Sequence, residues 1–139
     1  MANHPIQLYS GNTTSGRLTM SDGRSTDADR GDQISWSIGQ GNVASFHIAG
    51  KSPVNIFTRA IPTSNGTILN LDVSSSAPSG DWKYSIMWID TQLGQMHTDD
   101  PKIAVKPVKF NFTMFIALMA SAIISLLTVT FFRRKKDKE

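Results

Sequence analysis

An uncharged apolar run limits the fold of this chain more than any other feature. It extends from Phe110 to Phe132, and a basic cluster follows it directly. A helix rises about 1.5 Å per residue, so about 20 apolar residues cross a hydrocarbon core of about 30 Å. The sequence therefore predicts one membrane-spanning helix. The basic cluster that flanks it consists of Arg133, Arg134, Lys135 and Lys136.

We expect three parts along the chain: a soluble domain over residues 1–106, a transmembrane helix over residues 107–132 and a basic tail over residues 133–139. Residues 1–132 contain equal numbers of basic and acidic side chains, so the net charge of +3 belongs to the tail. Because the domain carries no net basic charge, we expect no nucleic-acid partner. The tail is typical of clusters beside anionic headgroups, and the expected partner is the lipid bilayer.

Small side chains recur at every fourth position of the apolar run. They are Thr113, Ala117, Ser121 and Ser125. A spacing of four residues places them on one helix face, and small residues let helices approach closely in lipid. This stripe predicts contact with a second copy of the chain or with another membrane subunit. The alternative is an ordinary single span in which the stripe has no role.

Both ends of the sequence bear on which side of the membrane the domain lies. Residues 1–10 have neither the basic nor the apolar region of a secretory signal. The positive-inside rule alone would place the basic tail in the cytoplasm and the domain outside. A span that ends seven residues before the last residue favours insertion after synthesis instead. We therefore expect a single-pass, tail-anchored protein with a cytoplasmic domain.

Short alternations of apolar and polar residues mark the predicted strands. The clearest runs are residues 34–38 and 82–88, where apolar side chains occupy every second position. This period of two is typical of strands with one buried face. Short strands without an amphipathic helix predict a mainly β fold, an antiparallel Greek-key β-sandwich of about seven or eight strands. Trp36, Trp82 and Trp88 are expected in its core, with Trp88 the most exposed of them.

Four further segments complete the predicted domain. They are a hairpin or long loop between Ser10 and Gly31, a strand through Val54, Ile56 and Thr58, a hairpin turn at Asn65-Gly66, and a loop from Asp90 to Pro101.

Three segments resemble the cupredoxin-like sandwich. They are Arg-Gly-Asp-Gln-Ile-Ser-Trp at 30–36, Ser-Phe-His-Ile at 45–48, and Gly-Asp-Trp-Lys-Tyr-Ser-Ile at 80–86 followed by Pro-Lys-Ile-Ala-Val at 101–105. Residues 100–103 are also similar to small bacterial inclusion-body proteins of the AidA/PixA type. The resemblance extends over residues 30–106 and implies a sandwich whose first copper-ligand position is His47.

The chain contains no cysteine. A blue-copper site needs a thiolate together with two imidazoles, so this chain lacks one of the required ligands. The resemblance therefore implies a copper-free sandwich that serves as a binding or structural module, with no cofactor. Disulfides and thiolate zinc sites are excluded for the same reason.

His47, Met96 and His97 are the candidate metal ligands. Imidazole and thioether groups suit Cu(I), and His97 follows Met96 directly in the chain. The alternative is that His97 lies in a polar loop where Asp99 and Asp100 shape a turn. His47 lies between Phe46 and Ile48, and its side chain is expected to face away from the core.

No motif indicates catalysis. The sequence contains no Gly-x-Ser-x-Gly, no phosphate-binding glycine loop and no His-Glu-x-x-His. We expect a non-enzymatic, membrane-anchored interaction or accessory subunit of a membrane protein assembly. A metal-binding or electron-transfer protein that uses His47, Met96 and His97 is the alternative. A third hypothesis is a membrane-tethered hydrolase or sugar-binding protein with a site beside Trp88, which no motif supports.

Overall fold

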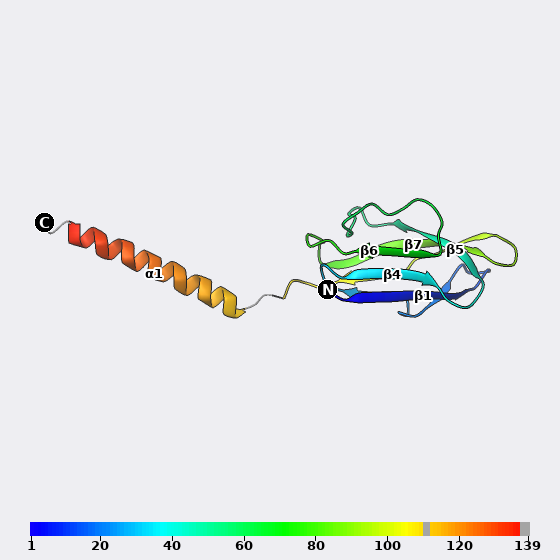
Figure 1. The fold of residues 1–139 in the computed structure, drawn as a ribbon, viewed down its shortest axis with the longest axis horizontal. Coiled ribbons are helices and arrows are strands. Elements are labelled where there is room, and N and C mark those ends of the chain that lie inside the picture. The colour runs from blue at the N-terminus through cyan, green and yellow to red at the C-terminus, as the bar shows by residue number, and fades with distance from the viewer. Residues whose placement is uncertain (110–111, 137–139) are drawn as a thin grey trace. The chain divides into compact units, whose positions relative to one another are not determined.

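The structure is a computed structural model that describes residues 1–109 and 112–136. In the last helix it describes the side chains of residues 113 and 115–126. The chain divides into two compact units, Met1–Pro107 and a second unit that begins at Val108. The elements are β1 (Asn3–Gly11), β2 (Leu18–Met20), β3 (Ser25–Ala28), β4 (Gln33–Ile38), β5 (Val43–Gly50), β6 (Ile68–Asp72), β7 (Gly80–Asp90), β8 (Met96–Asp99), β9 (Lys102–Val105) and α1 (Phe112–Lys136) (Figure 1).

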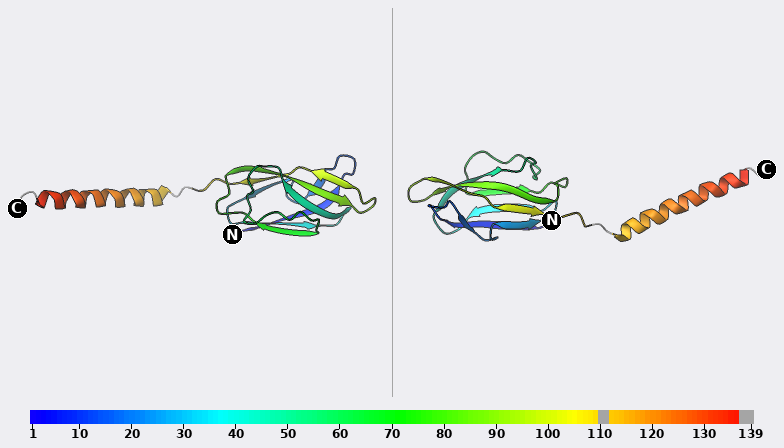
Figure 2. Two further views of the ribbon diagram at one scale, coloured as in Figure 1. Left: turned by 90° about the horizontal axis from the view of Figure 1, so that it is seen from above. Right: turned by 180° about the vertical axis from the view of Figure 1, so that it is seen from behind.

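The strands form two sheets that pack face to face (Figure 2). The first sheet has the order β2-β1-β4-β6, and the second has the order β3-β9-β7-β5. Strands β8 and β9 follow one another along the same edge of β7, opposite residues 86–89 and 80–83. The prediction of a mainly β sandwich is confirmed.

The sheets are mixed, which corrects the expectation of a wholly antiparallel sandwich. β1 pairs with β4 in parallel, and β3 pairs with β9 in parallel. Parallel neighbours need a crossover connection, and β2 and β3 supply it between β1 and β4. The part of the chain that the structure describes has nine strands rather than seven or eight. The additional ones are short: β2, β3 and β8 have three or four residues each, too few for a clear alternation in the sequence.

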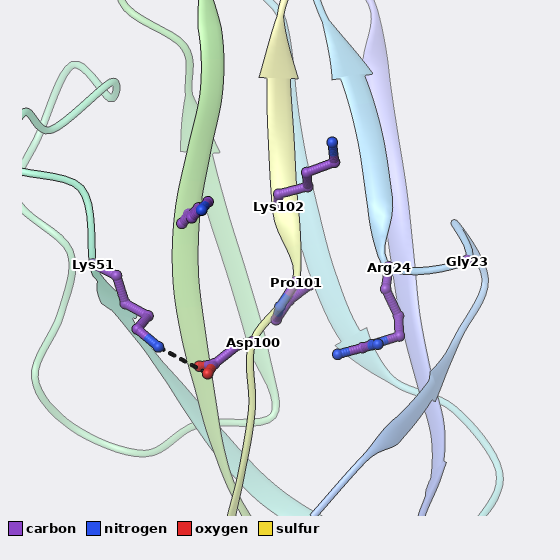
Figure 3. A pocket seen from close by; sticks show the side chains of 7 residues that line it. Gly23, Arg24, Lys51, Asp100, Pro101 and Lys102 are labelled. Atoms are coloured by element: carbon purple, nitrogen blue, oxygen red, sulfur yellow. Dashed lines mark hydrogen bonds and ion pairs between the residues drawn. The ribbon is translucent and has the colours of Figure 1, made fainter.

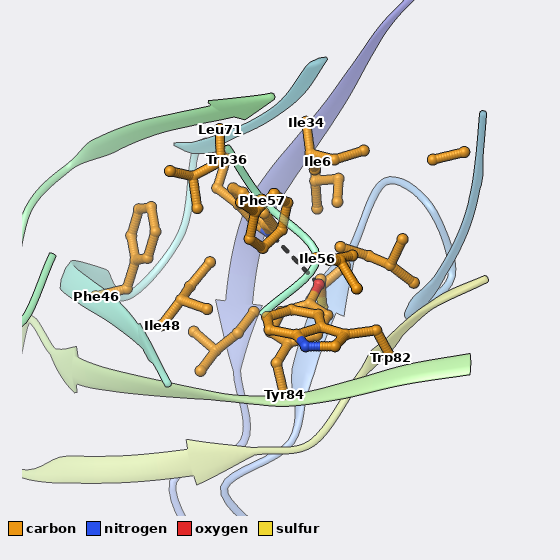
Figure 4. Packing of buried hydrophobic residues seen from close by; sticks show 14 of the residues in the cluster. Ile6, Ile34, Trp36, Phe46, Ile48, Ile56, Phe57, Leu71, Trp82 and Tyr84 are labelled. Atoms are coloured by element: carbon orange, nitrogen blue, oxygen red, sulfur yellow. Dashed lines mark hydrogen bonds between the residues drawn. The ribbon is translucent and has the colours of Figure 1, made fainter. Parts of the chain in front are cut away.

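Strand β7 forms the centre of the second sheet, and its side chains alternate as predicted. Trp82, Tyr84, Ile86 and Trp88 are at most 3% exposed, and the residues between them face outward. The ring of Tyr84 lies 5.9 Å from that of Trp36 on β4 and 5.2 Å from that of Trp82 (Figure 4). The Trp36 Nε1–H donates a hydrogen bond of 3.2 Å to the Tyr84 hydroxyl. This contact joins the two sheets at the middle of the core.

Trp88 is fully buried, so the expectation that it is the most exposed tryptophan is wrong. The loop between β1 and β2 covers it: the Trp88 Nε1–H donates to the Gly16 carbonyl at 2.8 Å. Gly11 lies directly against the indole, because a Cβ at this position would be 2.1 Å from its ring carbons. A glycine at residue 11 is therefore required by the close approach.

The segment between β5 and β6 is irregular, which corrects the strand expected through Val54, Ile56 and Thr58. Ile56 and Phe57 are consecutive and both buried, which the alternation of a strand does not permit. Asn65-Gly66 forms no hairpin turn, because Gly66 pairs with Phe46 of β5. Phe57 instead enters the core, with its ring 5.1 Å from that of Trp82 (Figure 4).

Asp32 ties the start of the chain to the start of β4. Its carboxylate accepts hydrogen bonds from the Ala2 amide at 2.7 Å, His4 Nε2 at 2.8 Å and the Asp29 amide at 3.0 Å. Burial raises the pKa of Asp32, but these hydrogen bonds outweigh it and lower the pKa to about 2. The carboxylate therefore stays ionised well below neutral pH.

The central hydrogen bond of the core gives a first prediction. Tyr84→Phe removes the acceptor of the buried Trp36 N–H and should lower the free energy of unfolding by about 1–3 kcal/mol. Trp36→Phe combined with Tyr84→Phe should cost less than the sum of the two single changes, because the unpaired donor is then absent. Urea denaturation of the full chain in a non-ionic detergent measures both quantities. Strict additivity would show that the hydrogen bond contributes nothing.

Asp32 gives a prediction of acid sensitivity. Its pKa lies below the ordinary value of 3.8, so its contribution is complete above about pH 4 and is lost as the pH falls through about 2. Asp32→Asn should reduce the urea midpoint at neutral pH and flatten its decline over this range. Asp27→Asn, at an exposed carboxylate of β3, is the control and should leave the decline unchanged. An identical decline in both variants would contradict the assignment.

Candidate functional site

The structure does not bring the two candidate histidines together. His97 lies opposite Trp88 on β7, its ring 4.5 Å from the indole and its side chain 9% exposed. His47 lies opposite Met87 on the other edge of β7. Met87 and Trp88 are consecutive in the strand and point to opposite faces of the sheet. His97 therefore faces the interior, whereas His47 faces away from the core, as predicted for His47.

Met96 is separated from His97 in the same way. The two are neighbours on β8, and Met96 is 64% exposed. Within residues 1–109 and the described part of α1, no group of three or more His, Cys, Asp or Glu side chains could hold a metal ion. The Nδ1 of His47 is 2.9 Å from the Asn65 side-chain oxygen, which gives this imidazole a protein partner.

The segment expected to be a loop from Asp90 to Pro101 is a tight hairpin that contains β8. Asp90 accepts hydrogen bonds from the amides of Leu93 at 2.6 Å, Gln92 at 2.9 Å and Gln95 at 2.9 Å. The Leu93 hydrogen bond is the main reason that the pKa of Asp90 falls to about 2, although burial opposes it. His97 Nε2 is 3.2 Å from the same carboxylate. His97 thus helps to hold the hairpin.

A groove on the outer face of the second sheet collects basic side chains (Figure 3). It encloses about 500 Å³. The residues that line it are Gly23, Arg24, Lys51, Lys83, Asp100, Pro101 and Lys102. Its four basic residues follow the strand order β3-β9-β7-β5: Arg24 precedes β3, Lys102 is on β9, Lys83 is on β7 and Lys51 follows β5. We call these four residues the basic row.

One end of the basic row is fixed by an ion pair between the half-buried Arg24 and the buried Asp99. The Arg24 Nε donates to Asp99 at 3.0 Å, and its Nη2 contacts the other oxygen of the same carboxylate. Asp99 also accepts the amides of Leu18 at 2.9 Å and Asp100 at 2.8 Å. The pair therefore holds the corner between β8 and β9 against the turn before β3. Removing one partner from such a pair leaves a buried charge uncompensated.

Two other cations of the row have carboxylate partners. The Lys51 ammonium is 2.8 Å from Asp100, whose second oxygen accepts the Ser85 hydroxyl at 2.7 Å. The Lys51 hydrogen bond is the main reason that the pKa of Asp100 is lowered. Lys102 lies 2.7 Å from Asp81.

Lys83 differs from the other three members of the basic row. Its side chain is exposed, and its ammonium forms no ion pair or hydrogen bond with the residues that the structure describes. Its backbone, by contrast, is fixed: the Lys83 amide donates to the Ser52 hydroxyl at 3.0 Å, and its carbonyl accepts the Lys51 amide at 2.9 Å. The sequence alone does not reveal this groove, because its basic residues are far apart in the chain and the domain carries no net basic charge.

Helix α1 presents apolar side chains along its described part. Those that are large and exposed are Phe115, Ile116, Leu118, Met119, Ile123, Ile124 and Leu126. Thr113, Ala117, Ser121 and Ser125 are also exposed, and the Ser125 hydroxyl donates to the Ser121 carbonyl at 3.0 Å. The side chains of Arg133, Arg134, Lys135 and Lys136, and all of residues 137–139, lie outside the described part of the chain. Among the described residues, no helix has the length and apolar character needed to cross a membrane.

Comparison with known proteins gives a likeness to solved structures and none to a family. No protein family and no curated protein matches the chain. Among solved structures, a pseudoazurin from Sinorhizobium meliltoi aligns over 77% of this chain and 76% of its own, at 12% identity and a TM-score of 0.42. The fold assignment accordingly rests on the strand order given above.

Proposed function

We propose that this chain is a membrane-anchored interaction or accessory subunit, in which α1 is the anchor and the sandwich is the binding part. The observation that carries the proposal is the apolar surface of α1. Phe115, Leu118 and Met119 lie on one face of the helix and Ile124 lies on the opposite side, and all four are exposed. A helix that is apolar on every side is stable in a large core or in a membrane.

The length and flanking residues of α1 support the same assignment. Counted over all 25 residues, including those whose side chains the structure does not describe, the helix extends about 37 Å at about 1.5 Å per residue. A hydrocarbon core is about 30 Å thick. The basic cluster at its end suits anionic headgroups. Within α1, the Ser125 hydroxyl is already bonded to the Ser121 carbonyl, so it can be accommodated in lipid without a water partner.

We further propose that the sandwich is a cupredoxin-like frame used without copper. The segments that resemble this family form β4, β5, β7 and β9 of the sandwich. The frame would present its loops and sheet faces for binding, as sandwiches do in proteins of many functions.

Membrane anchoring predicts the behaviour of the chain during extraction of cell membranes. The full chain should remain in the membrane pellet after alkaline carbonate treatment. Leu118→Arg with Ile123→Arg should release it, because each arginine at the centre of a span costs about 2.5–3.5 kcal/mol. Val54→Arg with Leu93→Arg, at exposed apolar residues of the sandwich, is the matched control and should stay in the pellet. Recovery of the unchanged chain in the supernatant would refute the anchor.

The stripe of small residues predicts an assembly through α1. Purified in a mild detergent, the full chain should have a mass above that of its monomer, or a second membrane subunit should co-purify. Ala117→Leu with Ser121→Leu should abolish this association, because larger side chains separate the helices. Ala122→Leu adds one leucine on another face and is the control. A monomer without a partner, measured by light scattering, would contradict the prediction.

A further inference from the structure

We propose that the groove formed by the basic row binds a small phosphorylated ligand that carries more than one negative charge, with Lys83 as the residue that recognises it. This inference concerns the sandwich alone and does not depend on the anchor. It starts from the placement of the cations on the sheet, which local stability does not explain.

Two lysines of the basic row lie directly opposite each other. Lys83 on β7 pairs with Lys102 on β9 in the antiparallel register. Side chains at opposed positions have Cβ atoms about 4.5–5.5 Å apart, and like charges placed there destabilise a sheet. Asp81 compensates Lys102 at 2.7 Å, but Lys83 has no such partner among residues 1–109. Arrangements that break a local rule in this way are typical of functional sites.

The fixed partners of the row leave Lys83 as its unmatched cation. Asp99, Asp100 and Asp81 hold Arg24, Lys51 and Lys102 respectively. Both oxygens of Asp100 are occupied, by Lys51 and by the Ser85 hydroxyl. Asp100, the one carboxylate that lines the groove, therefore points to its partner Lys51 (Figure 3). This leaves the Lys83 ammonium to an incoming anion.

The dimensions of the row indicate the kind of anion. Adjacent strands are about 4.8 Å apart, so Lys102, Lys83 and Lys51 extend across about 10 Å. A lysine ammonium serves as a point charge for phosphate and has three donors, of which the ion pairs of Lys51 and Lys102 use one each in this structure. A volume of about 500 Å³ is that of a small-molecule site. A diphosphate or a bisphosphorylated headgroup has both the size and the charge to contact the three ammonium groups.

Calorimetric titration of the full chain in a non-ionic detergent, at low salt, tests the inference. The probes are inorganic pyrophosphate and a short-chain, water-soluble phosphatidylinositol bisphosphate. Lys83→Gln should raise the Kd of the bound probe about tenfold or more, the effect of losing one charge-assisted contact. Lys106→Gln removes the same charge from an exposed lysine outside the groove and should leave the Kd unchanged.

The outcomes separate the sources of the phosphate and can overturn the inference. Tighter binding of the lipid identifies a headgroup, and tighter binding of pyrophosphate identifies a soluble compound. No binding of either probe by the unchanged chain, or equal weakening in both variants, would refute the site.

Lys83→Gln should melt at the same temperature as the unchanged chain or higher, because it removes the repulsion from Lys102. A lower melting temperature would show that Lys83 stabilises the sheet instead, and would also refute it. Because both probes are soluble, this test can fail while the anchor stands.

Discussion

The packing of Trp36 against Tyr84 is the contact on which the sandwich depends. It joins β4 of the first sheet to β7 of the second through both ring packing and a hydrogen bond. Burial raises the pKa of the Tyr84 hydroxyl, which stays neutral and accepts the indole N–H at the centre of the core. Trp82 and Phe57 extend the same aromatic layer. With the inward face of β7 fixed in this way, every second residue of that strand must face solvent.

This constraint connects the core to the candidate site. Lys83 lies between Trp82 and Tyr84, so its side chain is directed to the outer face by its neighbours' burial. The pairing of β7 with β8 and then with β9 leaves a corner at Asp100-Pro101. At this corner the half-buried Asp99–Arg24 pair adds a cation from a third segment. The groove is therefore a product of sheet register and of one half-buried ion pair, rather than of a flexible loop.

The parts of the fold that the sequence predicted are those that a strand determines by itself. The alternations on β4 and β7 fixed which residues are buried, and the outward direction of His47 followed from the same rule. The sequence did not predict which strands pair, because a parallel pair such as β1 and β4 joins segments far apart in the chain. Trp88 was misjudged because its cover, Gly11 and Gly16, belongs to another segment. The basic row could not be predicted either, because only the order of four strands brings its residues together.

The same register explains why His97 takes part in closing the hairpin between β7 and β8. His97 is held between the Trp88 ring and the Asp90 carboxylate, and three backbone amides share that carboxylate. A ligand that drew His97 away would remove one of the contacts that close the hairpin, and Met96 faces the opposite side of the sheet. On the outer face of β7, by contrast, the Lys83 side chain makes no hydrogen bond or ion pair with the residues that the structure describes. Lys83, the cation of the basic row without a carboxylate partner, is presented there by a rigid strand. Sites built on strands hold their side chains more precisely than sites built on loops, which supports recognition of a charged ligand at this position.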